Sequence, residues 1–254
     1  MNQTSKSETI QKAVKLIQKS QNMVVLTGAG VSTPSGIPDF RSSQTGLWTQ
    51  NDPFQVASLS AFRYRPQVFF DWLRPLARKM WAAQPNPAHI ALADLEKAGY
   101  LHAIITQNID GLHQKAGSHN VIEVHGSANQ FACLKCGQSF PGEECIDPFI
   151  HQAQIPRCPT CSSILKPQIV LFEEMLPIEA WTAAEQHCEK ADLILVIGSS
   201  LEVIPAANLP YQALRHGARL IINTISETYL DGCADVLLPF DVVTTLPEIA
   251  AMLL

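Results

Sequence analysis

Short apolar runs of strand length recur along the chain. They lie at residues 23–27, 103–106, 193–197, 220–222 and 236–238. None of them alternates polar with apolar residues, so neither face of the expected strands is predicted to be exposed to solvent. Such strands are typical of parallel sheets that helices cover on both faces.

Helical patterns lie between these runs. Ile10, Val14 and Ile17 recur at helical spacing before the first run, and Gly217 follows the last helical segment as a helix-stop residue. Further helices are expected at residues 87–97, 178–190 and 205–216. Strands that alternate with helices in this way predict an α/β fold, built as a Rossmann-like doubly wound parallel sheet.

Length and composition are those of an ordinary globular protein. The chain has 254 residues, of which 46% are hydrophobic and 16% charged, with a formal net charge of -5. The mild acidity argues against direct nucleic-acid binding. Residues 1–21 lack both an apolar signal core and an Arg-rich presequence pattern, and no apolar run reaches the roughly 18 residues that span a bilayer. We therefore expect a cytoplasmic protein with no membrane partner.

Four of the seven cysteines form two pairs. Cys133 and Cys136 are followed, after 21 intervening residues, by Cys158 and Cys161. Two Cys-x-x-Cys knuckles at this spacing are typical of a tetrahedral zinc site, whereas a disulfide framework suits small secreted chains. Because four protein ligands close the site, the zinc is expected to be structural.

Paired knuckles also occur in zinc ribbons that bind nucleic acid, and these carry a basic face. Three basic residues between positions 131 and 166 (Lys135, Arg157, Lys166) are balanced by three acidic ones (Glu143, Glu144, Asp147). The neutral charge of this module argues against a nucleic-acid partner.

Two stretches interrupt the alternation of strands and helices. Residues 38–84 are rich in aromatic side chains, with a helix expected at 66–79, and residues 127–167 contain the paired cysteines. We assign both to a smaller lobe, the first as a cofactor loop with a helical insertion and the second as a zinc-ribbon module. The large Rossmann-like domain then consists of residues 1–37, 85–126 and 168–254.

A glycine-rich turn follows the first apolar run. Gly28 and Gly30 would let the backbone turn tightly and approach a pyrophosphate, although a strand-to-helix turn also needs glycine for structural reasons. Thr33 stands where a dinucleotide fingerprint has its third glycine, and no acidic residue ends a strand about 20 residues later. A hydride-transferring dehydrogenase is therefore disfavoured.

Polar residues also follow other expected strands. Open α/β sheets bind ligands at the carboxyl ends of their strands. Three groups of polar or small residues lie at such ends of the expected strands: residues 107–110 (Gln-Asn-Ile-Asp), residues 198–200 (Gly-Ser-Ser) and Asn223. His125 comes just after a further short apolar segment. A lone histidine is more often structural than catalytic, yet imidazole is the side chain best suited to exchange protons near neutral pH.

Five ordered motifs, spread over nearly the whole chain, resemble those of the sirtuin family. They are residues 28–41, residues 106–113, the His125-Gly126 pair, the paired cysteines and residues 198–205. The resemblance implies that His125 is the catalytic base and that Asn108 acts beside the ribose of NAD. It implies cofactor contacts by Gly28, Ala29, Gly30, Thr33, Phe40, Arg41, Gln107, Asn108, Ile109, Asp110, Gly198, Ser199, Ser200 and Asn223.

The reaction implied by this resemblance is NAD-dependent removal of acyl groups, chiefly acetyl, from protein lysine side chains. The acyl oxygen would displace nicotinamide and His125 would deprotonate a ribose hydroxyl, so that nicotinamide and O-acyl-ADP-ribose are released. The acyl-lysine protein or peptide would pair as an extended strand with the segments around Phe172 and Val203. Two other functions stay open, a protein ADP-ribosyltransferase and a non-catalytic NAD-sensing protein.

Two features bear on the substrate side. The family usually has Phe-Gly-Glu where residues 172–174 read Phe-Glu-Glu, which removes backbone freedom and adds a negative charge beside the peptide cleft. Sirtuins that prefer acidic acyl groups carry a Tyr-x-x-Arg pair, and alignment through residues 66–69 puts Phe70 and Leu73 at those positions. Arg74 lies one position out of register. We therefore expect neutral acyl groups to be preferred.

Overall fold

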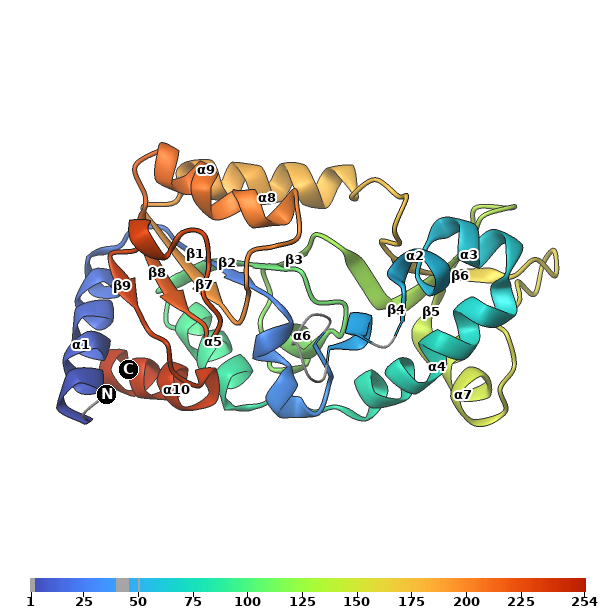
Figure 1. The fold of residues 1–254 in the computed structure, drawn as a ribbon, viewed down its shortest axis with the longest axis horizontal. Helices are drawn as coiled ribbons and strands as arrows, with labels where there is room; N and C mark the ends of the chain where they lie inside the picture. Colours follow the sequence, from blue (N-terminus) through green and yellow to red (C-terminus); the bar gives the residue numbers. More distant parts are fainter. Residues whose placement is uncertain (1–2, 40–45, 50) are drawn as a thin grey trace.

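The computed structural model describes residues 3–39, 46–49 and 51–254 (Figure 1). Its centre is a six-stranded parallel sheet with the strand order β3-β2-β1-β7-β8-β9. The strands are β1 (Met23–Thr27), β2 (Leu101–Thr106), β3 (Val121–Glu123), β7 (Leu193–Ile197), β8 (Arg219–Asn223) and β9 (Val236–Leu237). The chain order reverses between β1 and β7, as in dinucleotide-binding sheets. The predicted doubly wound α/β fold is confirmed.

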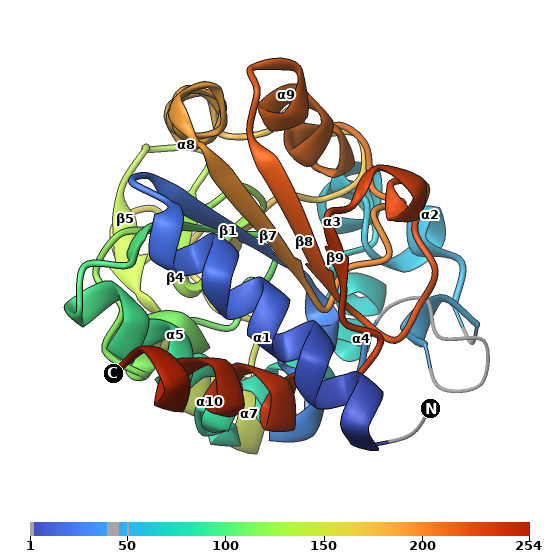
Figure 2. The ribbon, with the colours of Figure 1, turned by 90° about the vertical axis from the view of Figure 1, so that its left-hand side faces the viewer.

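Helices cover both faces of this sheet (Figure 2). One face carries α1 (Gln3–Lys19), α5 (Pro87–Lys97) and α10 (Val242–Leu253), and the other carries α8 (Ile178–Lys190) and α9 (Leu209–Arg215). Ile10, Val14 and Ile17 are buried beneath the first layer, which confirms the helix expected there. Because the strands contribute side chains to a core on each side, they have no solvent face and therefore no alternation.

The structure divides the helix that was predicted at residues 205–216. Ala206–Asn208 form a 3-10 turn, and α9 begins only at Leu209. Pro210 lies in the first turn of α9, and because it has no N–H it cannot continue a helix that began earlier. Gly217, with a φ of 96°, follows the end of α9, so the predicted helix stop is confirmed.

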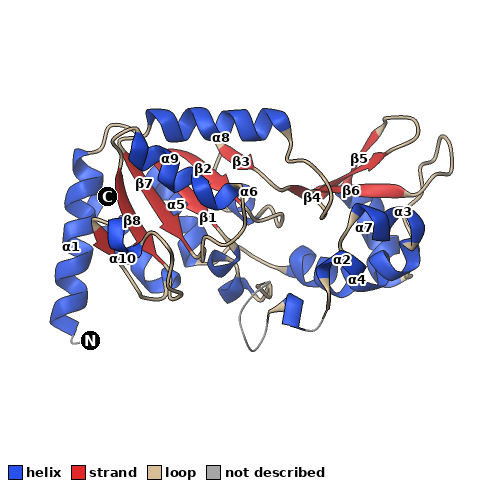
Figure 3. Ribbon diagram, turned by 45° about the horizontal axis from the view of Figure 1, so that its top comes forward, coloured by secondary structure: helices blue, strands red, loops and turns tan. Residues whose placement is uncertain are grey.

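The smaller lobe lies beside the sheet (Figure 3). Its elements are α2 (Pro53–Val56), α3 (Leu59–Tyr64), α4 (Pro66–Ala82), β4 (Gly126–Cys133), β5 (Ser139–Pro141), α7 (Gly142–His151) and β6 (Leu165–Ile169). Strand β4 pairs antiparallel with both β5 and β6. The Phe70 ring on α4 lies 5.4 Å from the Phe149 ring on α7, so the helical insertion and the cysteine-bearing module share one core. The predicted boundary after residue 167 falls inside β6, and the division into domains stays a prediction.

Short elements connect these layers. They are α6 (Leu112–Lys115) and 3-10 turns at Ala29–Val31, Thr33–Ser35, Leu47–Thr49 and Asp231–Cys233. The first two turns follow β1 directly, so the chain stays close to the sheet edge there. In the part of the chain that the structure describes, no helix is long and apolar enough to cross a membrane.

Candidate active site and metal centre

The loops after β1 and β7 pack directly against each other where the strand order reverses. Gly30 N donates a hydrogen bond to Gly198 O at 2.8 Å. A Cβ on Gly28 or Gly30 would approach Gly198 O to 2.9 or 2.8 Å, and Gly198 itself has a φ of 58°. These glycines therefore allow two loops to touch. Folds with this strand order bind dinucleotides in the crevice at this point.

A cavity of about 570 Å³ lies in this crevice, and we call it the first cavity. Its volume is in the range of small-molecule sites. Nine of the residues expected to bind the cofactor line it: Gly28, Ala29, Gly30, Thr33, Gln107, Asn108, Gly198, Ser199 and Ser200. Phe40 and Arg41 lie outside the described residues. The first cavity thus gathers predicted residues from the ends of β1, β2 and β7.

Gln107 and Asn108 are fixed at the wall of the first cavity by their side-chain amides. Asn108 Nδ2 donates to Gly28 O at 3.1 Å and to Ser32 Oγ at 3.0 Å. Gln107 Nε2 donates to Ser199 Oγ at 3.0 Å. These bonds tie the end of β2 to the loops after β1 and β7, so both amides are held in place before any ligand binds.

Three expected cofactor contacts lie elsewhere. Ile109 lines a different cavity. Asp110 accepts a hydrogen bond from the backbone of α6 at 2.9 Å, and burial raises the pKa of its carboxyl group. Asn223 Nδ2 donates to Leu238 O at 2.8 Å and to Phe240 O at 2.9 Å, so its amide holds the chain after β9. The cofactor contacts of these three residues stay predictions.

A second cavity, of about 620 Å³, lies between the two lobes. Its wall is mostly apolar and includes Trp48, which stacks on Trp72 with ring centroids 5.7 Å apart and meets Phe172 edge-on at 5.9 Å. Among the described residues no Lys or Arg lines this cavity, whereas Glu173 and Glu174 do. The sequence does not single out either tryptophan, and the aromatic richness of residues 38–84 is its only signal. The second cavity therefore suits an extended, mostly apolar ligand.

The two cavities meet at Gln107, His125 and Val203, which line both of them. His125 precedes Gly126, whose φ is 74° and whose lack of a Cβ avoids a collision with Gln168 O. His125 Nδ1 lies 3.0 Å from Gln107 O. Because a carbonyl oxygen only accepts, Nδ1 carries the proton in the neutral ring and Nε2 holds the basic lone pair. The fold thus brings a proton acceptor to the boundary between the cavities.

Two other histidines, His89 and His113, are buried with ring centroids 4.9 Å apart. Burial lowers the pKa of His89 to about 4. Burial, together with the charge on His89, lowers the pKa of His113 to about 3. Both rings are therefore neutral at physiological pH, and neither lines the first or the second cavity. Their contacts are structural, with Ser32 Oγ 3.4 Å from His89 Nε2 and Thr27 Oγ1 3.0 Å from His113 Nε2.

The Phe172 segment is joined to the start of α3. Phe172 N donates to Ala57 O at 3.1 Å, and Leu59 N donates to Phe172 O at 3.0 Å. Glu173 has a φ of 74°, a left-handed conformation that favours the glycine usual in the family. Glu173 Oε2 accepts a hydrogen bond from Ser60 N at 2.9 Å, and hydrogen bonds from the side chain and backbone of Ser60 lower its pKa. The Glu173 carboxylate, which adds the negative charge beside the cleft, is therefore hydrogen-bonded to the first turn of α3.

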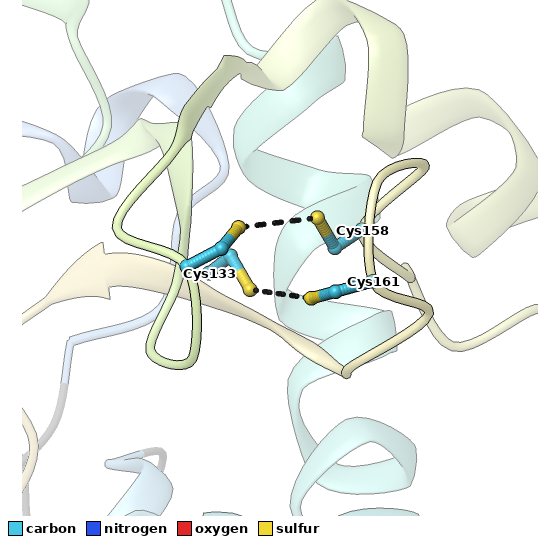
Figure 4. A group of neighbouring side chains, drawn as sticks. Cys133, Cys158 and Cys161 are labelled. Atoms are coloured by element: carbon cyan, nitrogen blue, oxygen red, sulfur yellow. Dashed lines mark hydrogen bonds between the residues drawn. The ribbon is translucent and has the colours of Figure 1, made fainter.

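The four paired cysteines converge in the smaller lobe. Figure 4 labels three of them, Cys133, Cys158 and Cys161. Cys133 Sγ lies 3.4 Å from Cys161 Sγ, and Cys136 Sγ lies 3.6 Å from Cys158 Sγ. All four sulfur atoms lie within 4.8 Å of one another. A tetrahedral zinc with Zn–S bonds of about 2.3 Å separates its sulfur ligands by roughly 3.8 Å. The spacing therefore fits one structural zinc.

Each cysteine pair is presented by the same kind of turn. Gly137 N donates to Cys133 O at 2.9 Å, and Ser162 N donates to Cys158 O at 2.8 Å. Both donors have positive φ angles, 75° for Gly137 and 59° for Ser162. In the sequence Gly137 indicates the first turn and Pro159-Thr160 the second, although the left-handed position of the second turn is occupied by Ser162.

Comparison with known proteins identifies the family. A model of the Sir2 family matches residues 28–205. The chain is 44% identical over 230 residues to NAD-dependent protein deacylase 2 of Archaeoglobus fulgidus, with 90% of each chain covered. It is 44% identical over 216 residues to NAD-dependent protein deacetylase 1 of Geobacillus kaustophilus, covering 85% of this chain and 86% of that one.

Solved structures agree with the sequence comparison. A complex of Sir2 with a p53 peptide and NAD+ matches this fold with a TM-score of 0.87 at 38% identity, covering 96% of this chain and 98% of that one. The chain belongs to the Sir2 family, that is, to the sirtuins. The resemblance drawn from the five motifs is therefore confirmed.

Proposed function

We infer that the chain is an NAD-dependent protein lysine deacylase. The observation that carries this conclusion is the meeting of two cavities at His125, one at the switch point of the sheet and one between the lobes. The first suits NAD and the second suits an acyl-lysine side chain with its peptide. Relatives described as an NAD-dependent deacylase and deacetylase, and a Sir2 complex that holds both peptide and NAD+, support the same function.

The residues at the junction suggest how the acyl group is transferred. When bound, NAD supplies the ribose that accepts the acyl group as nicotinamide leaves. We propose that His125 takes a ribose hydroxyl proton on Nε2, since its Nδ1 is engaged with Gln107 O. Asn108 holds the ribose beside it. The apolar wall of the second cavity keeps water from the reacting centre.

The remaining site assignments are proposals of the same kind. Phe172 and Val203 pair with the substrate peptide, and the four cysteines hold zinc. The proposed cofactor contacts are Gly28, Ala29, Gly30, Thr33, Phe40, Arg41, Gln107, Asn108, Ile109, Asp110, Gly198, Ser199, Ser200 and Asn223.

We also propose a cytoplasmic location. Because the net charge is mildly negative, we propose no direct nucleic-acid binding. The large domain is assigned to residues 1–37, 85–126 and 168–254. The smaller lobe is assigned to residues 38–84 and 127–167.

Nicotinamide release tests the function. Purified protein mixed with NAD and an acetyl-lysine peptide should release nicotinamide and deacetylated peptide in equal amounts. A non-catalytic NAD sensor would release neither product. An ADP-ribosyltransferase would release nicotinamide but leave the acetyl group on the peptide.

We expect neutral acyl groups to be removed much faster than acidic ones. Leu73 lines the second cavity, whereas Phe70 is buried against Phe69 and Phe149 and does not reach it. Burying a succinyl carboxylate without a partner costs several kcal/mol. The kcat/KM for an acetyl-lysine peptide should therefore exceed that for the succinyl peptide by a factor on the order of 10² or more.

Arg74, one position out of register, is engaged outside the second cavity. Its Nη1 lies 2.8 Å from Asp71 Oδ1, and its Nε donates to Phe149 O at 3.1 Å. A rotation of α4 toward the cavity would carry Asp71 along with Arg74 but would break the bond to Phe149 O, which belongs to α7. The measurement compares acetyl, long aliphatic acyl and succinyl groups on one peptide, and the long aliphatic group should also be removed well. Succinyl removal as fast as acetyl removal would contradict the prediction.

A further inference from the structure

A buried lysine lies behind the wall of the second cavity. Residues 169–175 are consecutive in the chain, and all of them line that cavity. Lys166 precedes them in β6 and is only 7% exposed. It lines neither the first nor the second cavity, so it cannot touch the substrate. Any effect of Lys166 on the reaction must act through the residues that it contacts.

The Lys166 ammonium group contacts three oxygen atoms. It donates to Ile169 O at 2.7 Å and to Pro167 O at 3.2 Å, and it lies 2.8 Å from Glu174 Oε2. These contacts use all three N–H donors of an ammonium group. Glu174 Oε2 also accepts a hydrogen bond from Leu171 N at 2.9 Å. Lys166 therefore links Ile169, the first residue of the stretch 169–175, to Glu174 near the end of that stretch.

The same stretch is bonded to the catalytic loop and to the smaller lobe. Val170 N donates to His125 O at 2.8 Å. Phe172, two residues later, pairs with Ala57 and Leu59 through its backbone. The stretch that Lys166 holds in place is therefore hydrogen-bonded to the backbone of His125. It also contains Phe172, which is proposed to pair with the peptide.

We propose that the Lys166–Glu174 ion pair positions residues 169–175 to receive the acyl-lysine peptide and thereby sets the affinity for peptide but not for NAD. The inference rests on the proposed function. The pair is largely buried, with side-chain exposures of 8% and 21%, so its charge-assisted bonds are little screened by water. None of residues 169–175 lines the first cavity, so none of them would contact NAD there.

Lys166→Met in the full-length zinc-loaded protein tests this role. The substitution keeps an unbranched chain but removes the cation that joins the two parts of the stretch. We expect the KM for an acetyl-lysine peptide to rise by about tenfold or more, the usual size for a lost charge-assisted hydrogen bond. The KM for NAD should stay unchanged. Lys6→Met is the matched control, because it removes a lysine from the exposed ion pair with Glu248 (2.9 Å) and should alter neither KM.

Two further variants separate positioning from general stability. Lys166→Arg keeps a cation near Glu174 and should restore most of the peptide affinity. In a double-mutant cycle, Lys166→Met combined with Glu174→Gln should be no worse than Lys166→Met alone, because the pair acts as a unit. If Lys166→Met loses zinc or melts early, the milder Lys166→Gln decides through its peptide KM, because this side chain lines neither cavity.

The outcomes distinguish this proposal from the function on which it rests. An unchanged peptide KM in the deciding variant, or an equal rise in both KM values, overturns the positioning role. A wild-type protein that does not deacylate the peptide contradicts the proposed function instead.

Discussion

Replacing His125 by alanine is expected to lower deacylation by a factor on the order of 10² or more, the usual loss when a general base is removed. The His125 ring lies at the junction of the two cavities, and the contact of its Nδ1 with Gln107 O places the basic lone pair on Nε2. NAD binding should persist, since the other lining residues of the first cavity remain. Turnover measured at saturating NAD and peptide, together with a direct titration of NAD binding, checks both expectations.

The matched control for this variant is His216→Ala. His216 Nδ1 also lies close to a backbone carbonyl, Gln212 O at 2.9 Å, but the side chain is exposed and lines neither cavity. The control should keep full activity. Near-normal turnover of His125→Ala would remove His125 from the mechanism.

Cys133→Ser is expected to abolish zinc binding and to unfold the smaller lobe. Cys133 is buried, and all four sulfur atoms are needed to complete the tetrahedral site. Because metal binding in such modules is coupled to folding, losing it should cost several kcal/mol and lower the melting temperature by roughly 10 °C or more. Strand β6 leads directly into residues 169–175, so deacylation should be lost as well.

Zinc content measured by mass spectrometry and a thermal melt check this prediction. Cys145→Ser is the matched control, since Cys145 packs against the cysteine cluster in the same lobe but is not one of the four converging sulfur ligands. It should retain one zinc per chain. A Cys133→Ser protein that is zinc-free yet stable and active would show that the metal is not structural.

The sequence by itself determined the elements whose causes are local. Strands β1 and β7 follow the expected runs at 23–27 and 193–197, because burial on both faces demands an unbroken apolar segment. Helices α5 and α8 likewise have the predicted bounds of 87–97 and 178–190. The zinc ligands were also predictable, since each knuckle is closed by hydrogen bonds within a few residues of its own cysteines.

The tertiary structure alone decided where individual side chains point. Asn223 ends β8 at the ligand-binding edge, as expected, yet its amide is bonded to Leu238 O and Phe240 O. Trp48 and Trp72 are separated in the sequence but stack in the wall of the second cavity. No periodic pattern marks such contacts.

The ion pair of Lys166 with Glu174 and the placement of His125 show the same limit. For Lys166 and Glu174, the pattern of apolar residues does not show that the two side chains meet. The sequence places His125 just after a short apolar segment, but whether its ring meets a carbonyl or a cavity depends on distant segments. For His125, the partner is Gln107 O, at the end of the neighbouring strand β2. Local pattern therefore determines elements and knuckles, whereas the directions of functional side chains follow from packing between elements that the sequence does not bring together.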